Sequence, residues 1–343
     1  MAYAFQPLSV AGITVLVVSA LATMTIAALL QPFLRQYMLA RPNHRSSHKV
    51  STPQGGGIAV VTVTIVMVAI TFYIYPAPEI TLVQLSWIMA AALLLIAVGV
   101  IDDIYVVEAV PRLLLQAVAV GIVVAALPAD LRIISTLPWW IERVLIGVGS
   151  IWFVNLVNFM DGLDWMMVAE VVPTTAALVV FGQLGALPAV PTLVALALCG
   201  AMIGFAPFNR PVARLFLGDA GSLPIGLVLA WLLIVLAGSH FTAAALLPLY
   251  FVADATVTLM RRLFQGEPVM QSHRSHFYQR AIENGYSVAE VIGRIFALNF
   301  ALALLAVSTL LVETRFFHVL SFAVGCTLVA IVLAAFSRRR RQR

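Results

Sequence analysis

Long apolar segments alternate with short polar ones along almost the whole chain. A helix needs about 20 mostly apolar residues to cross a bilayer, and roughly eleven segments approach that length. They are residues 10–34, 56–75, 80–101, 113–127, 140–158, 162–182, 186–206, 222–238, 241–260, 291–311 and 317–336. Apolar residues run continuously within each segment, whereas the strands of a membrane barrel alternate apolar and polar residues. The pattern therefore predicts an all-α, polytopic membrane protein.

Composition supports this prediction and excludes an ordinary water-soluble globule. The 343 residues are 62% hydrophobic and only 10% charged, with a mean hydropathy of +1.03, whereas soluble domains carry about 25% charged residues. No lysine or arginine precedes the first apolar segment, which is longer than the core of a signal peptide, so we expect a retained span. Because no repeat or separate soluble segment interrupts the pattern, we expect residues 1–343 to form one transmembrane domain.

Lysine and arginine fall almost entirely on alternate loops, which predicts the orientation in the membrane. With the N-terminus outside, 17 of the 20 Lys and Arg residues lie inside. These are Arg35, Arg41, Arg45, Lys49, Arg112, Arg210, Arg214, Arg261, Arg262, Arg274, Arg280, Arg294, Arg338, Arg339, Arg340, Arg341 and Arg343. We expect a cytoplasmic C-terminus whose basic tail, residues 337–343, contacts anionic lipid. Nucleic-acid binding is not expected of a polytopic protein.

The polar residues gather on the inside loops, which predicts one site on the cytoplasmic face. The first loop, residues 41–57, is basic and ends in three glycines that open a helix, an arrangement suited to phosphate or to a plain positive-inside turn. The next cluster, Asp102 and Asp103, stands at a helix end where the dipole disfavours anions, with Arg112 following. Charges next to a span this apolar are usually functional, so we favour a metal-dependent phosphate site over a solvated helix end.

A third cluster repeats polar residues at every third position: Asn155, Asn158, Asp161 and Asp164. Each step of three turns a helix by about 300°, so these side chains follow one slowly winding stripe. Gly162 permits a break where the carboxylates need to face a cavity. Carboxylate and amide oxygens are the ligands of a hard cation such as Mg²⁺, while a polar seam between helices is the alternative.

Two further loops complete the set. Asp219 lies in a turn flanked by glycines, which permits close approach of the backbone to a ligand. The alternative is an ordinary aspartate in a turn. His273, Arg274 and His276 suit a diphosphate clamp or a basic inside loop. Zinc is disfavoured because no cysteine or further histidine accompanies them. Asp254 and Glu170 lie inside apolar segments, and we interpret Asp254 as a supporting residue of the site.

These clusters, in this order, resemble the polyprenyl-phosphate N-acetylhexosamine-1-phosphate transferases, glycosyltransferase family 4. The resemblance covers about residues 41–280. Two motifs carry it, residues 158–164 (NFMDGLD) and 216–222 (FLGDAGS). The stretch 273–280 (HRSHFYQR) is similar to the branch that begins O-antigen and related polysaccharides. The triple-histidine run of the phospho-N-acetylmuramoyl-pentapeptide translocase is absent.

The resemblance implies a role for each matching residue. Asp102, Asp103 and Asp161 would be catalytic, with Asp102 the base on the acceptor lipid phosphate. Asn158 and Asp219 would hold Mg²⁺, with Mn²⁺ able to replace it. The residues implied to bind substrate are Lys49, Arg112, Gly162, Leu163, Asp164, Phe216, His273, Arg274 and His276. The sequence departs from the family pattern at two places. Val106 and Val107 occupy a stretch where the family often has lysine, and Arg112 is the candidate to replace that lysine. Trp165 stands where the family usually has glycine.

The activity implied is transfer of N-acetylhexosamine 1-phosphate from a UDP-sugar to undecaprenyl phosphate in a bacterial inner membrane, as the first membrane step of O-antigen or related polysaccharide synthesis. Direct attack and an aspartyl-phosphate intermediate both agree with these residues, as do a monomer and a homodimer. The alternatives are the pentapeptide translocase, a lipid-diphosphate phosphatase and a membrane transporter. A transporter would show paired inverted halves and mid-membrane polar sites, and the sequence shows no such halves.

Overall fold

A computed structural model of the chain describes residues 7–40, 51–76, 81–105, 107–267 and 273–339. Its helices are α1 (Val10–Tyr37), α2 (Gly57–Ile74), α3 (Leu82–Tyr105), α4 (Ala109–Ala126), α5 (Trp139–Met160), α6 (Met166–Gln183), α7 (Ala189–Phe205), α8 (Asp219–Leu246), α9 (Leu249–Phe264), α10 (Phe277–Glu283), α11 (Val288–Leu311) and α12 (Arg315–Phe336). Two short antiparallel strands, β1 (Leu39–Ala40) and β2 (Thr52–Pro53), follow α1. The prediction of an all-α polytopic protein is confirmed.

Each of the apolar segments predicted from the sequence contains a helix. Among the described residues, nine helices are long and apolar enough to cross a membrane: α1 to α6, α8, α11 and α12. The helix α7 is equally apolar but has 17 residues, and α9 has 16. The break expected between residues 238 and 241 is confirmed at His240 (φ −132°, ψ 62°), where two helical stretches of α8 meet at a kink. The span expected over 241–260 is interrupted, because α8 ends at Leu246 and α9 begins after Pro248, whose missing N–H favours a helix start.

The helix α8 forms the centre of the bundle. Within its most apolar stretch 89% of residues are buried, compared with 22% in α1, and it packs against α2, α3, α5 and α11. Two backbones meet closely here, because a Cβ on Gly99 of α3 would lie 2.3 Å from the amide of Ala220. Large apolar side chains on the outer helices point outward instead, for example Phe316 and Val319 of α12, as expected for contact with lipid tails.

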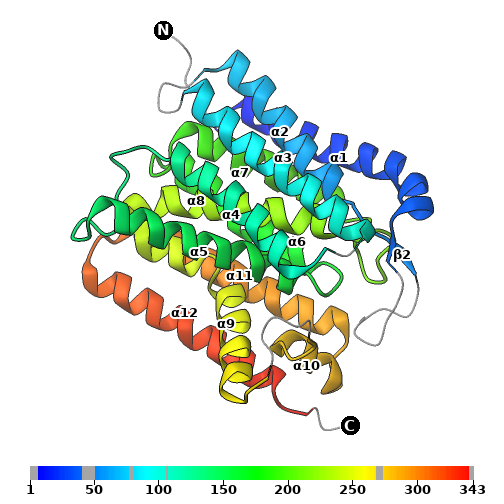
Figure 1. The fold of residues 1–343 in the computed structure, drawn as a ribbon. Coiled ribbons are helices and arrows are strands. Elements are labelled where there is room, and N and C mark those ends of the chain that lie inside the picture. The colour runs from blue at the N-terminus through cyan, green and yellow to red at the C-terminus, as the bar shows by residue number, and fades with distance from the viewer. Residues whose placement is uncertain (1–6, 41–50, 77–80, 106, 268–272, 340–343) are drawn as a thin grey trace.

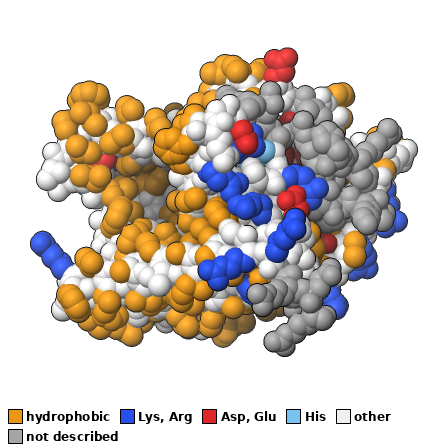
Figure 2. Space-filling model, turned by 90° about the horizontal axis from the view of Figure 1, so that it is seen from below, with side chains coloured by type: hydrophobic (Ala, Val, Ile, Leu, Met, Phe, Trp, Pro, Cys, Tyr) orange, Lys and Arg blue, Asp and Glu red, His pale blue; other side chains and the backbone are white. Residues whose placement is uncertain are grey.

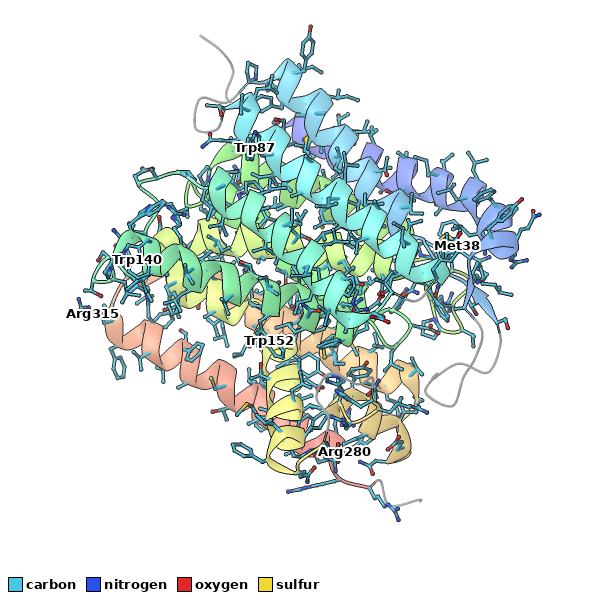
Figure 3. The ribbon with its side chains drawn as sticks, viewed as in Figure 1. Met38, Trp87, Trp140, Trp152, Arg280 and Arg315 are labelled. Atoms are coloured by element: carbon cyan, nitrogen blue, oxygen red, sulfur yellow. The ribbon has the colours of Figure 1, made fainter. Side chains whose placement is uncertain are left out.

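The long helices run side by side in Figure 1, and the two chain ends lie at opposite ends of the bundle. The helices α9 and α10 lie at the lower end, close to the C-terminus. In Figure 3, Trp87 and Trp140 mark one end of the bundle, while Met38 and Arg280 lie toward the other. The polar ends of α3, α5 and α8 meet at this second end, where the functional side chains converge.

Candidate active site

The carboxylate of Asp102 is paired at the end of α3. Its Oδ1 accepts a hydrogen bond from the Val107 amide at 2.6 Å, and its Oδ2 accepts one from Arg112 Nη1 at 2.8 Å. The same guanidinium nitrogen lies 3.5 Å from Asp219 Oδ2. Arg112 therefore links two acidic side chains from different helices. It lies where a cation is needed, although it is several positions beyond the stretch where the family often has lysine.

Asp103 holds the start of α8. Its two carboxylate oxygens accept hydrogen bonds from the amides of Asp219, at 3.0 Å, and Ala220, at 3.2 Å. These amides belong to the first turn of a helix, where backbone donors lack partners within the helix. The preceding Gly218 has φ +75°, and a Cβ there would lie 2.5 Å from Asp103 Oδ2. Glycine is therefore required at this position.

The two predicted magnesium ligands lie side by side. Asn158, in the last turn of α5, donates from Nδ2 to Asp219 Oδ1 at 2.8 Å and to Ser222 Oγ at 2.9 Å. With the amide nitrogen so engaged, the amide oxygen is left to act as an acceptor or ligand. The side chain of Asp219 is 28% exposed, so its carboxylate is reachable.

These oxygens fit Mg²⁺. Within the described part of the chain no three His, Cys, Asp or Glu side chains converge as a metal cage. Mg²⁺ does not require one, because it usually keeps several waters and binds through one or two carboxylates together with substrate phosphates. The neighbouring carboxylate of Asp219 and amide oxygen of Asn158 agree with this mode of binding.

The turn between α5 and α6 brings Asp161 to the same place. Asp161 ends α5, and burial raises the pKa of its carboxyl to about 7, with added repulsion from Asp103 and Asp164. Next to it, Gly162 lies against Tyr278, whose hydroxyl would be 2.0 Å from a Cβ at this position. Leu163 is buried. The predicted break at Gly162 is confirmed as a tight turn that a larger side chain would obstruct.

Asp164 and Trp165 tie this turn to the loop after α7. Asp164 is buried and its Oδ2 accepts from the Ala213 amide at 3.0 Å. Trp165 donates from its amide to Asn209 Oδ1 and from its indole Nε1 to the Ala206 carbonyl, both at 2.7 Å. Its φ is 64°, and it is the only non-glycine residue with positive φ in the described ranges. The usual glycine is thus replaced where the backbone conformation favours glycine.

The glycine run of the first loop packs against the Phe216 loop. The amides of Gly56 and Gly57 donate to the carbonyls of Phe216 and Leu217, each at 2.9 Å, and the Phe216 amide donates to Pro53 at 2.8 Å. These two glycine amides are already engaged, so they are not free to bind phosphate. The predicted ligand Lys49 lies outside the described residues.

We call residues 273–276 the histidine loop. The rings of His273 and His276 stack with centroids 4.8 Å apart. Burial lowers the pKa of His273 to about 4, helped by the nearby His276 and the cationic Arg262 and Arg261. His273 is therefore neutral at neutral pH. Figure 2 shows basic side chains gathered around acidic ones and a histidine on the face that carries α9 and α10.

Sequence reasoning missed several supporting contacts. Arg261 and Arg262 of α9 reach Ser275 of the histidine loop, at 3.0 and 3.3 Å. Tyr278 donates from its hydroxyl to the Phe159 carbonyl at 3.1 Å, which joins α10 to α5. The only available signals were the basic pair at a span end and the aromatic residue two positions after a histidine.

The two buried acids within apolar segments have different surroundings. Glu170 accepts a hydrogen bond from Asn299 Nδ2 at 2.8 Å, between α6 and α11 and apart from the clusters described above. Asp254 instead meets the histidine loop through His276, at 3.3 Å. The interpretation of Asp254 as a supporting residue is therefore consistent with where the structure places it.

Comparison with known proteins agrees with this arrangement. The model of Glycosyl transferase family 4 matches residues 85–237. Phospho-N-acetylmuramoyl-pentapeptide-transferase of Synechococcus sp. (strain JA-3-3Ab) is 31% identical over 82% of this chain and 87% of its own length. The probable undecaprenyl-phosphate N-acetylglucosaminyl 1-phosphate transferase of Bacillus subtilis (strain 168) is 27% identical over 76% and 75%. Decaprenyl-phosphate N-acetylglucosaminephosphotransferase of Mycobacterium leprae (strain TN) is 25% identical over 90% and 85%.

The multi-pass helical bundle, taken together with these relatives, defines the class as a membrane-embedded transferase. The chain belongs to glycosyl transferase family 4, the polyprenyl-phosphate hexosamine-1-phosphate transferases.

Proposed function

We propose that this enzyme transfers N-acetylhexosamine 1-phosphate from a UDP-sugar to undecaprenyl phosphate, as the first membrane step of O-antigen or a related surface polysaccharide. The observation that carries the proposal is the meeting of Asp219 with Asn158, Asp103 and the Asp102–Arg112 pair at one end of the bundle. The names of the relatives support a polyprenyl phosphate acceptor.

An apolar groove supports a lipid acceptor. A cavity of about 260 Å³ lies between α5 and α8, lined by residues such as Ile146, Phe153, Leu233 and Ala237. A Cβ at Gly149 would meet nothing within 4 Å, so the groove has room along α5. The acidic cluster lies where α5 ends and α8 begins, whereas the α8 residues that line the cavity lie toward the other end of that helix. A polyprenyl tail in this groove would therefore have to extend along α5 and α8 for its phosphate to reach the acidic cluster.

In the proposed reaction, an oxygen of the acceptor phosphate attacks the β-phosphorus of the donor. The bond from this phosphorus to the bridging oxygen breaks, and UMP leaves with the electron pair. Asp102 would take or hold the acceptor proton, and Arg112 would orient the two anions. Bound Mg²⁺, held by Asn158 and Asp219, would neutralise charge on the diphosphate. Phosphoryl transfer depends mostly on such positioning and electrostatics.

The orientation belongs to this proposal, with the N-terminus outside and the acidic end in the cytoplasm. The orientation follows from the distribution of lysine and arginine. It places the acidic end on the side of the membrane where UDP-sugars are supplied. A fusion of alkaline phosphatase to the C-terminus should be inactive. An active fusion would show that the C-terminus lies outside and would contradict this orientation.

One assay tests the activity. Purified protein receives labelled UDP-N-acetylglucosamine, UDP-N-acetylgalactosamine, their 6-deoxy forms or UDP-N-acetylmuramoyl-pentapeptide, each with and without undecaprenyl phosphate. UMP release that requires both the lipid and a small UDP-sugar supports the proposal. Turnover of the pentapeptide donor alone would make the enzyme a phospho-N-acetylmuramoyl-pentapeptide-transferase, which is the name of the Synechococcus relative. Release of inorganic phosphate from a lipid diphosphate would indicate a phosphatase, and lipid-independent uptake a transporter.

A further inference from the structure

Asp254 is a fully buried carboxylate at the middle of α9. Its Oδ2 accepts from the Tyr250 hydroxyl at 3.1 Å, and its Oδ1 lies 3.4 Å from Thr258 Oγ1. Both partners are on α9 itself, one turn before and one turn after. Each oxygen is also in contact with a hydrogen-bonding group outside α9.

The two oxygens of Asp254 also accept hydrogen bonds from the segment that follows the histidine loop. Oδ1 of Asp254 accepts from the Phe277 amide at 3.0 Å, and Oδ2 accepts from the Tyr278 amide at 3.1 Å. These are the first two residues of α10, whose amides have no partner within that helix. Asp254 therefore fixes where α10 begins relative to α9.

The same carboxylate binds the ring of His276. Nδ1 of His276 lies 3.3 Å from Asp254 Oδ1. A carboxylate oxygen accepts a hydrogen bond from a ring N–H, so this contact favours a proton on Nδ1 and leaves Nε2 at the opposite edge of the ring. The ring lies between His273, at 4.8 Å, and Tyr278, at 5.7 Å, in stacked arrangements. His276 is thus held on its edge by Asp254 and on both faces by rings.

We propose that Asp254 is a positioning residue for the histidine loop: it fixes the orientation and tautomer of His276, which in turn supports His273 at the diphosphate of the donor. This inference rests on the proposed function. Tyr278 extends the effect, because its hydroxyl bonds to the Phe159 carbonyl beside Asn158. One buried carboxylate thereby sets the histidine loop relative to the proposed magnesium ligands.

A double-mutant cycle tests the proposal. Asp254→Asn preserves shape but removes the charge, and His276→Gln removes the ring. Each single change should lower kcat on the order of 10–100-fold, the size of the loss when the hydrogen-bond partner of a metal-binding histidine is removed. KM for undecaprenyl phosphate should stay unchanged. The double variant should be no worse than the singles, because residues that act through one another are not additive. Losses that multiply would overturn the proposal.

The matched control is Tyr250→Phe, which removes a hydrogen bond to Oδ2 and leaves the contact of Oδ1 with His276. It should retain wild-type kcat. If Tyr250→Phe lost as much as Asp254→Asn, the carboxylate would serve general packing, and the proposal would fail.

A second readout does not need activity. Diethyl pyrocarbonate should modify His276 slowly in the wild-type protein, because its side chain is 3% exposed. Asp254→Asn should accelerate this modification, and Tyr250→Phe should not. If Asp254→Asn does not fold, His276→Gln alone should accelerate modification of His273, which loses its stacked support; an unchanged rate overturns the proposal. Wild-type protein that releases no UMP would refute the proposed function while this labelling result still decides the role of Asp254.

Discussion

The carboxylate of Asp103 caps the helix that carries Asp219, since it accepts the amide hydrogens of Asp219 and Ala220 at 3.0 and 3.2 Å. The adjacent Asp102 has different partners, namely Arg112 and the Val107 amide. Two neighbouring acids that look equivalent in the sequence are therefore distinct in the structure. Asp103 orders the first turn of α8, whereas Asp102 is the acid paired with a cation at the mouth of the site.

Asp103→Ala should destabilise the protein and also reduce turnover. Loss of a cap at a helix N-terminus lowers stability by about 1–2 kcal/mol. The backbone amide of Asp219 would also lose its hydrogen bond to Asp103, which positions this residue. We expect a lower melting temperature in detergent together with a lower kcat. Asp103→Asn keeps one acceptor oxygen and should lie between the two. A melting temperature equal to that of the wild type for Asp103→Ala would show that the cap contributes nothing.

Asp219→Asn and Asn158→Ala should weaken the response to Mg²⁺. Each change removes one hard oxygen from the proposed ligand pair, so we expect kcat to fall by about 100-fold or more and the Mg²⁺ concentration for half-maximal activity to rise. Titration with Mg²⁺ and Mn²⁺ measures both effects. A variant with wild-type activity and metal dependence is not altered in a metal ligand.

Asp102→Asn should abolish transfer while leaving binding of the UDP-sugar largely intact, because we assign this acid to the acceptor. Its pairing with Arg112 adds a second expectation. Arg112→Lys keeps the charge, and since the single nitrogen Nη1 of Arg112 approaches both acids, an ammonium group can replace it in part; this variant should retain part of the activity. Calorimetry with the UDP-sugar separates the roles: equal loss of donor binding in Asp102→Asn would move this acid to the donor pocket.

His273 should make stability depend on acidity. Its pKa in the folded protein, about 4, is below the ordinary value of 6.5, so the folded state favours the neutral ring. The resulting stabilisation is present above pH 6.5 and is lost as the pH falls from 6.5 toward 4, because the unfolded chain binds the proton first. The melting temperature of the wild type should therefore fall more steeply over this range than that of His273→Gln. If the melting temperatures of the two proteins fell in parallel over this pH range, the lowered pKa of His273 would be refuted.

The sequence predicted the fold and the grouping of the site because both depend on strong local patterns. Continuous apolar runs indicate spans, and buried or membrane-adjacent charge is rare enough to mark a site. Asn158, Asp219, Asp102 and Asp103 converge as expected, although they are far apart in the chain.

Other features depend on tertiary contacts that no local pattern encodes. The engagement of the Gly56 and Gly57 amides depends on a loop more than 150 residues away. The helix α10 was missed because a helix of 7 residues is too short to show an apolar period, and its start is fixed by Asp254 of another helix. The end of α8 at Leu246 was missed because apolar residues continue through this turn into α9.

Trp165 offers a test of how the donor pocket is held. A non-glycine residue in the left-handed region is destabilised by about 1–3 kcal/mol, and here two hydrogen bonds, to Asn209 and the Ala206 carbonyl, offset this strain. Trp165→Phe keeps the strain and loses the indole donor, so its melting temperature should fall. Trp165→Gly relieves the strain and loses the same bond, so its melting temperature should stay near the wild type.

The two variants should differ less in binding than in stability. In both, the turn that carries Leu163 and Asp164 loses its indole bond to the loop after α7, so KM for the UDP-sugar should rise several-fold while KM for the lipid stays constant. A rise in both KM values would mean that the whole acidic end had loosened. Unchanged KM values in both variants would mean that the tryptophan only fills space. Because glycine satisfies the backbone without the indole, Trp165→Gly separates the anchoring role of this side chain from the strain that it imposes.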